Sequence, residues 1–109
     1  MGSTAVDITV YAFEAEALVH LRALVVHGAR RDVDLYDTLL RQNAQLVVGA
    51  FSVDADGDIV VTHTIPAAAV TEETLDAFAR GVINVLDVAD HFDDFIQGRW
   101  GGQRTIDRG

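Results

Sequence analysis

The stretch that decides the fold is residues 47–66, VVGAFSVDADGDIVVTHTIP. It contains two runs rich in apolar and β-branched residues, 47–54 and 58–65, and such runs predict strands. The acidic segment DADGD between them is typical of a tight hairpin turn, with Gly57 where a positive φ is needed. Pro66 ends the second strand because it cannot donate a hydrogen bond to a sheet. The stretch therefore predicts an antiparallel β-hairpin.

A helix is expected just before this hairpin, over residues 34–46. Its inward stripe includes Leu39 and also Asn43, and a carboxylate at Asp32 or Asp34 can cap its first turn. Because Asn43 falls where an apolar residue is expected, its amide must find hydrogen-bond partners. We expect it to bond the backbone near the helix end or the adjoining strand, a structural role that we prefer to a ligand-binding one.

Two further strands precede this helix. Residues 4–13 and 17–26 alternate apolar with polar side chains, which is the pattern of half-buried strands. The short polar segment 14–16 between them predicts a second antiparallel hairpin. In the first strand, Ile8 and Val10 share the face that we expect to be buried.

A long amphipathic helix is expected at the C-terminal side, over residues 71–97. Thr71 is its predicted N-cap and Gly98 its predicted stop. The element order is then ββαββα, an α+β fold in which two helices lie against a mostly antiparallel four-stranded sheet. We expect one domain over residues 4–98 and a flexible tail over residues 99–109.

Composition excludes several classes of function. The 109 residues include 17 acidic and 8 basic ones, a formal net charge of −9. This charge repels phosphate backbones and anionic lipids, so nucleic acid and membranes are not expected partners. The chain has no Lys and no Cys, which excludes a P-loop, a Schiff base, thiol catalysis and disulfides. The N-terminus has no signal-peptide features, and we expect a cytoplasmic protein.

The turn at residues 54–58 begins like a calcium-binding loop. Such a loop has Gly at its sixth position and Glu at its twelfth. Here Gly57 is at the fourth position and Ile65 at the twelfth. The segment is therefore interpreted as a solvated turn.

A second polar cluster lies on the predicted C-terminal helix. Asp87, Asp90, His91 and Asp94 fall on one helix face. The alternative function is therefore a small metal-dependent sensor or enzyme centred on His91. One helix face rarely supplies converging ligands, so we expect no metal, no cofactor and no catalytic residue.

The same helix has more apolar residues than one face can hold. A small domain with four strands and one other short helix can hardly cover a second apolar stripe, which favours a homodimer or another protein partner. A wider intramolecular core is the alternative. The predicted interface residues are Ile83, Val85, Val88, Phe92, Phe95 and Trp100.

Residues 39–90 resemble the YbjN-like family of bacterial sensory-transduction regulators, which shares its fold with class I type III secretion chaperones. The similar features are a leucine-rich helix with an Asn-containing end, a strand with Phe51, an acidic-Gly turn, a strand ending near Pro66, the triplet Thr-Glu-Glu and a long amphipathic helix. With the preceding hairpin, the similarity extends over residues 5–97. The resemblance implies a protein that holds or regulates other proteins, often as a homodimer, and it implies no catalytic residues.

The sequence departs from this family at its start. Secretion chaperones of this fold begin with a helix and another strand, and neither is expected before Thr4. The chain is either a shortened member or part of a longer protein, and a surface that such a helix would complete is not expected. We expect a non-enzymatic, chaperone-like or regulatory module. It would bind an extended partner segment through the outer sheet face and the apolar flank of the last helix.

Overall fold

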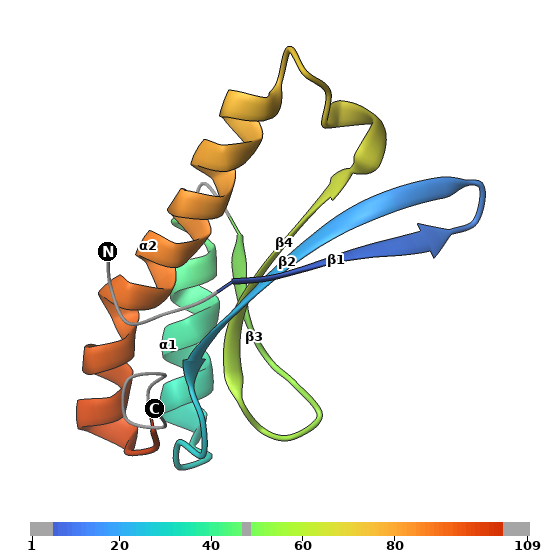
Figure 1. Cartoon of the computed structure of the whole chain (residues 1–109). Helices are drawn as coiled ribbons and strands as arrows, with labels where there is room; N and C mark the ends of the chain where they lie inside the picture. Colours follow the sequence, from blue (N-terminus) through green and yellow to red (C-terminus); the bar gives the residue numbers. More distant parts are fainter. Residues whose placement is uncertain (1–5, 47–48, 104–109) are drawn as a thin grey trace.

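The computed structural model describes residues 6–46 and 49–103, and these form two layers (Figure 1). One layer is an antiparallel sheet with the strand order β1-β2-β4-β3. Helices α1 and α2 form the other layer on one face of the sheet, and a short 3-10 helix, η1, follows β4. The bounds are β1 (Val6–Phe13), β2 (Glu16–Val26), α1 (Val33–Asn43), β3 (Ala50–Val53), β4 (Ile59–Pro66), η1 (Ala67–Ala69) and α2 (Leu75–Trp100). The predicted α+β fold and its ββαββα order are confirmed.

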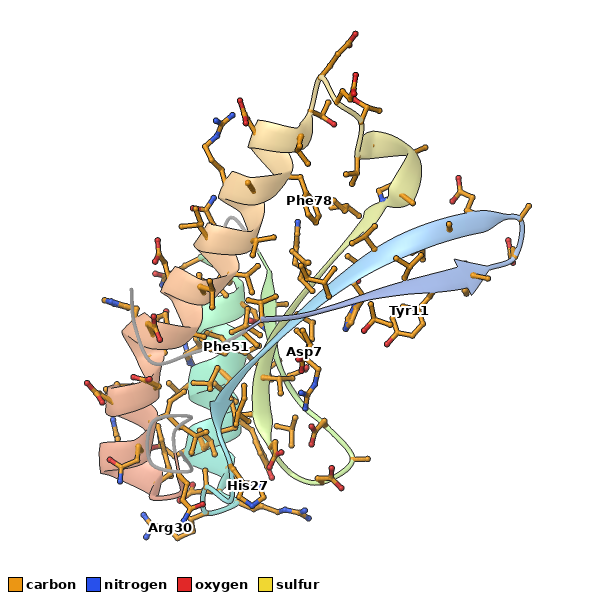
Figure 2. The ribbon with its side chains drawn as sticks, in the orientation of Figure 1. Asp7, Tyr11, His27, Arg30, Phe51 and Phe78 are labelled. Atoms are coloured by element: carbon orange, nitrogen blue, oxygen red, sulfur yellow. The ribbon has the colours of Figure 1, made fainter. Side chains whose placement is uncertain are left out.

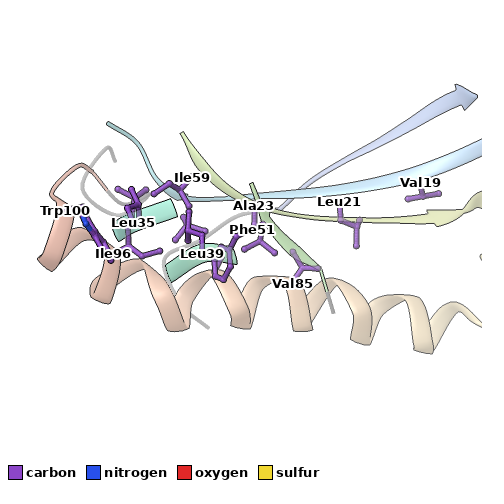
Figure 3. Close-up of a cluster of buried hydrophobic side chains, with 14 residues drawn as sticks. Val19, Leu21, Ala23, Leu35, Leu39, Phe51, Ile59, Val85, Ile96 and Trp100 are labelled. Carbon is purple, nitrogen blue, oxygen red and sulfur yellow. The ribbon is translucent and has the colours of Figure 1, made fainter. Parts of the chain in front are cut away.

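The core lies between the sheet and the two helices (Figure 3). The strands contribute alternate side chains from one face, as the period of two predicts. Each fully buried aliphatic side chain stabilises the fold by roughly 1.5–3 kcal/mol relative to an exposed one. The buried members include Leu21, Val25, Ile59 and Val61 from the sheet, Leu35 and Leu39 from α1, and Val85, Ala89, Ile96 and Trp100 from α2.

Side-chain to backbone hydrogen bonds fix α1 at both ends. At the start, Asp32 is the N-cap, and its carboxylate accepts from the backbone N–H of Asp34 at 2.7 Å. At the end, Asn43 donates from Nδ2 to the carbonyl oxygen of Phe51 at 3.1 Å and accepts from the Phe51 N–H at 2.7 Å. The amide therefore joins α1 to β3, which is the adjoining strand named by the sequence analysis.

The two hairpins turn as predicted. Gly57 has φ 83° between β3 and β4, in the left-handed region that favours glycine. The β1–β2 turn consists of Glu14 and Ala15, and Glu14 has φ 53°. The predicted third strand is shorter in the structure, and residues 47 and 48 lie outside the described residues.

The start of α2 lies later than predicted. The helix begins at Leu75, with Thr74 rather than Thr71 as its N-cap. Thr71 and Thr74 instead close a separate turn, because the backbone N–H of each donates to the hydroxyl of the other, at 2.8 Å and 3.3 Å. The N-cap prediction was wrong because these reciprocal bonds satisfy the local backbone before the helix starts.

The end of α2 also lies beyond the prediction. Gly98 is inside the helix, and Gly101, with φ 76°, follows its last residue. The Gly101 N–H donates to the carbonyl of Gln97 at 2.8 Å. Burial of Trp100, which is only 3% exposed, favours the continuation of the helix past Gly98.

Residues 99–103 belong to the domain and not to a tail. The backbones of Gln103 and His27 exchange two hydrogen bonds of 2.7 Å, and the Arg30 N–H donates to the Trp100 carbonyl at 2.8 Å. The predicted domain boundary at residue 98 is therefore too early. Residues 104–109 of the predicted tail lie outside the described residues.

The β1 strand pairs with β2 as predicted, but its apolar face is open. Helix α2 packs mainly on β2 and β4, and its contact with β1 is small. On the apolar face of β1, Val6 is half-buried against the core. Ile8 and Val10 are 52% and 65% exposed, although they lie on the face of the sheet that carries the core. The expected burial of these two side chains is therefore wrong.

Alanine substitutions at the two glycines near the C-terminal end of α2 should have opposite effects on stability. Gly98→Ala should raise the free energy of unfolding by about 0.5–1 kcal/mol, because Ala favours a helix interior. No heavy atom lies within 4 Å of an added Cβ at that position. Gly101→Ala should lower it by about 1 kcal/mol, because a side chain is strained at positive φ. Urea denaturation measures both, and a loss of stability in Gly98→Ala would place the helix end at residue 98.

Candidate functional site

The sheet and α2 diverge toward the N-terminal end of the helix (Figure 1). An open cleft lies between them there. The hollow has a volume of about 190 Å³. Figure 2 shows Phe78 pointing from α2 toward β4 across this space. We call it the sheet–helix cleft, and its lining residues are Leu21, His63, Ile65, Ala69, Thr74, Ala77, Phe78 and Gly81.

Strand register gives the floor of the cleft its composition. Residues directly opposite on neighbouring strands share a face of the sheet. Leu21 lies opposite His63 on one side and Ile8 on the other. Val19 lies opposite Ile65 and Val10 in the same way. The cleft floor, formed by Leu21, His63 and Ile65, therefore continues across the sheet onto the open face of β1. The continuous surface is two rows of three side chains, and it is apolar except for His63.

The wall of the cleft is the first half of α2. Phe78 is half-buried and packs against the edge of the core. Ala77 and Gly81 are small and four residues apart, so they share a helix face. An added Cβ at Gly81 meets no heavy atom within 4 Å. Small wall residues and an apolar floor leave room for side chains of another molecule.

The outer face of the sheet is more polar than the cleft. The His20 ring nitrogen Nδ1 and the Thr64 hydroxyl are 2.8 Å apart on this face. Arg22 is hydrogen-bonded and ion-paired with Asp54 beside them. Tyr11 lies on this side, with its ring edge against His20 at a centroid distance of 5.5 Å. Of the two surfaces, the outer face that the sequence analysis favoured is therefore the more polar one.

The predicted interface residues of α2 are mostly core residues. Val85 and Trp100 are 0% and 3% exposed, so a partner cannot contact them in the folded domain. Val88 and Phe92 are half-buried against the core, and the Phe92 ring meets the Phe51 ring edge-to-face at 5.1 Å. Four of the six residues therefore belong to or pack against a wider intramolecular core, which is the alternative named in the sequence analysis. Exposed members of the set are Ile83 and Phe95.

The polar cluster around His91 does not form a metal site in the described part of the chain. His91 and Asp87 are exposed on α2, and the His91 ring lies against the ring of the neighbouring Phe92. Within residues 6–46 and 49–103, the one group of three possible ligands close enough to hold an ion is Asp54, Asp56 and Asp58. The alternative of a sensor or enzyme centred on His91 thus has no convergent ligand geometry behind it.

The acidic turn uses its carboxylates within the fold. Asp54 Oδ1 accepts from the backbone N–H groups of Asp56 and Asp58 at 3.0 Å and 2.9 Å. Asp58 is buried and pairs with the His27 ring. Partial burial acts to raise the pKa of Asp54. The backbone hydrogen bonds and the Arg22 guanidinium outweigh it and hold this pKa below its usual value.

The cleft residues Phe78, Leu21 and Ile65 were not singled out by the sequence. Their apolar character is visible in the sequence, and Leu21 and Ile65 fall in the predicted strands 17–26 and 58–65. Which part of that face stays open depends on where α2 crosses the sheet, and hydrophobic periodicity does not encode that position. The sequence signal for this open surface was the alternation of apolar and polar residues along β1.

Fold and cleft together define a small α+β domain of the type III secretion chaperone fold. One similar solved structure is the crystal structure of the ExsC-ExsE complex, with a TM-score of 0.59 and 19% sequence identity. The match covers 82% of this chain and 75% of that chain. No curated protein has a significantly similar sequence. At such identity the structural likeness shows the fold alone.

The family of this chain is identified by a match of its sequence to a family model. The chain belongs to the TY-Chap1 family, described as T3SS (YopN, CesT) and YbjN peptide-binding chaperone 1, whose model matches residues 1–108. The predicted resemblance to YbjN-like proteins is confirmed. Among the described helices, none is both long enough and apolar enough to span a membrane.

The acidic turn predicts a specific dependence of stability on pH. Because the pKa of Asp54 is lowered by folding, its stabilisation is present above the unfolded pKa and is lost as pH falls through the folded one. The free energy of unfolding should therefore fall below about pH 4, and less steeply in Asp54→Asn. Urea denaturation at several pH values measures this. Asp56→Asn is the control, and the same slope in Asp54→Asn as in the unmodified protein would rule out this role.

Proposed function

We propose that this domain binds an extended, apolar segment of another polypeptide in the sheet–helix cleft and acts as a chaperone or regulator of that partner. The observation that carries the proposal is the uncovered apolar floor, above all Ile8 and Val10, which lie opposite Leu21 and Val19. Membership of a peptide-binding chaperone family supports the same kind of ligand.

Two sources of binding energy are available at this surface. Covering Ile8 and Val10 removes apolar area from water, at roughly 25 cal/mol per Å². The outer edge of β1 has no neighbouring strand in the described sheet. An extended segment can pair with such an edge through its backbone, while its alternate side chains continue the apolar floor. Backbone pairing fixes the register and the side chains determine which segments fit.

A binding role is favoured over an enzymatic one by the chemistry of the cleft. His63 is the one titratable side chain among the described residues that line it. General acid–base catalysis usually needs a second group to orient or complement the first. The His63 imidazole, alone on an apolar floor, is better suited to contact a bound polypeptide than to catalyse a reaction.

Loss of apolar contacts should weaken binding of a peptide probe. We expect Val10→Ser and Phe78→Ala each to raise the Kd for a labelled peptide of alternating Leu and Ser residues by about tenfold, which is about 1.4 kcal/mol. Fluorescence anisotropy measures the Kd. Ile83→Ser, at an exposed position on α2 outside the cleft lining, is the matched control and should bind normally. Unchanged affinity in Val10→Ser, which alters an exposed side chain, would place the binding surface elsewhere.

We also propose that two copies associate through α1 and the edge of β3. Since most of the predicted interface residues of α2 lie in or against the core, they no longer argue for a dimer. Val33, Tyr36 and Leu40 are exposed, and their three- and four-residue spacing puts them on one face of α1. Val53 is exposed on β3, the other edge strand of the sheet. If the two copies are related by a two-fold axis beside this edge, their interface buries these four side chains in each copy.

Salt should strengthen this association. Each copy carries a formal charge of −9, and the repulsion between copies is screened as ionic strength rises. Sedimentation velocity should show a larger dimer fraction in high salt than in low salt, and Leu40→Glu should remain monomeric in both. A single monomeric species at about 100 μM in high salt, where screening is strong, would refute the dimer.

A further inference from the structure

We infer that the side-chain amide of Asn43 closes the β3 edge of the sheet, so that a partner segment adds as a strand at β1 alone. This inference rests on the proposed function and assigns the edge that the same segment uses. An open sheet has two edges, and in the described sheet they are β1 and β3. Unpaired N–H and C=O groups along such an edge can pair with another polypeptide.

The strand register shows which backbone groups of β3 lie at the edge. In an antiparallel pair, successive residues direct their N–H and C=O groups alternately toward the neighbouring strand and away from it. The Asp54 N–H, directly after β3, donates to the Asp58 carbonyl across the hairpin at 3.0 Å. Counting back from Asp54 in this register, Phe51 and Val53 are the two residues of β3 whose backbone groups point away from β4.

The Asn43 side chain pairs with Phe51 as a neighbouring strand would. Its Nδ2 donates to the Phe51 carbonyl at 3.1 Å, and its Oδ1 accepts from the Phe51 N–H at 2.7 Å. A primary amide offers a donor and an acceptor, as a peptide group does, so both outward groups of Phe51 are satisfied. Within residues 6–46 and 49–103, Val53 is then the one residue of β3 whose outward groups have no partner. A single residue offers too few groups to hold an added strand.

The edge of β1 has no comparable closure in the described part of the chain. The strand has eight residues, VDITVYAF, and by the same alternation half of them direct their backbone groups outward. Apart from the pairing with β2, no hydrogen bond between described residues uses the backbone of residues 6–13. Natural edge strands are commonly protected by proline, by charged residues or by a bulge. This strand has no proline, one charged residue and an unbroken register with β2.

The two edges therefore differ in what they offer an extended segment. A strand added beside β1 lies next to the exposed side chains of Ile8 and Val10, so backbone pairing and apolar contact occur together. A strand added beside β3 must first displace the Asn43 amide and break its two hydrogen bonds. The contact proposed above between two copies then depends on side chains of α1 and β3 and does not continue the sheet.

Amide hydrogen exchange, followed by NMR, tests the closure in the free protein. The protection factor of the Phe51 amide should exceed that of the Val53 amide by about tenfold or more, because a hydrogen bond must open before its amide exchanges. Asn43→Ala should remove this difference. Gln45→Ala, at an exposed position just after α1, is the matched control and should keep it. Equal protection of Phe51 and Val53 in the unmodified protein would overturn the inference.

The same measurement in the presence of the peptide of alternating Leu and Ser residues shows which edge the segment uses. In the unmodified protein we expect new protection at alternate amides of β1 and none at Val53. In Asn43→Ala, new protection should also appear at Phe51 and Val53, because the β3 edge is then open. Circular dichroism verifies that this variant is folded, and the measurements on the unmodified protein do not depend on it.

The outcomes separate this inference from the proposed function. If the peptide binds and Val10→Ser weakens it, but no amide of β1 gains protection, the segment does not join the sheet, and the inference fails while the proposed function stands. New protection at Val53 in the unmodified protein, or none at β3 in folded Asn43→Ala, shows that Asn43 does not select the edge and also overturns it. If the peptide does not bind at all, the proposed function fails and the inference fails with it.

Discussion

The contact between α2 and the sheet is the constraint on which the rest of the structure depends. Ile96 and Trp100 fix the C-terminal half of the helix in the core beside Leu35 and Ile59. The other half of the helix diverges from the strands, as Figures 1 and 3 show. The C-terminal half of α2 therefore covers the core, whereas β1 stays largely uncovered beside the N-terminal half. The same packing that stabilises the domain therefore creates the open apolar floor.

Most of the fold could be predicted because its local signals agree with one another. Strand alternation, the Gly57 turn and the position of Asn43 each indicate the element that the structure contains. The ends of α2 could not be predicted in the same way. A glycine is compatible with both a helix interior and a helix end. The choice between Gly98 and Gly101 is made by the burial of Trp100, which is a tertiary contact.

The candidate site was less predictable than the fold. Helix α2 is apolar on more than one side, so periodicity alone could not say which stripe faces the sheet. Val85 and Trp100 were assigned to an interface and lie in the core, whereas Ile8 and Val10 were assigned to the core and lie open. Both errors have one physical origin, the rotation and crossing position of α2. These are set by packing over long sequence separations, and no local pattern records them.

We propose that the open half of the sheet is where a partner polypeptide binds. Side-chain methyl NMR spectra recorded during titration with the peptide of alternating Leu and Ser residues are the sharpest test, because they report each position separately. We expect the largest shift changes at Ile8, Val10, Leu21 and Ile65, and small ones at Val33 and Leu40 on α1. Shift changes centred on α1, with the methyl groups of the cleft unaffected, would contradict it.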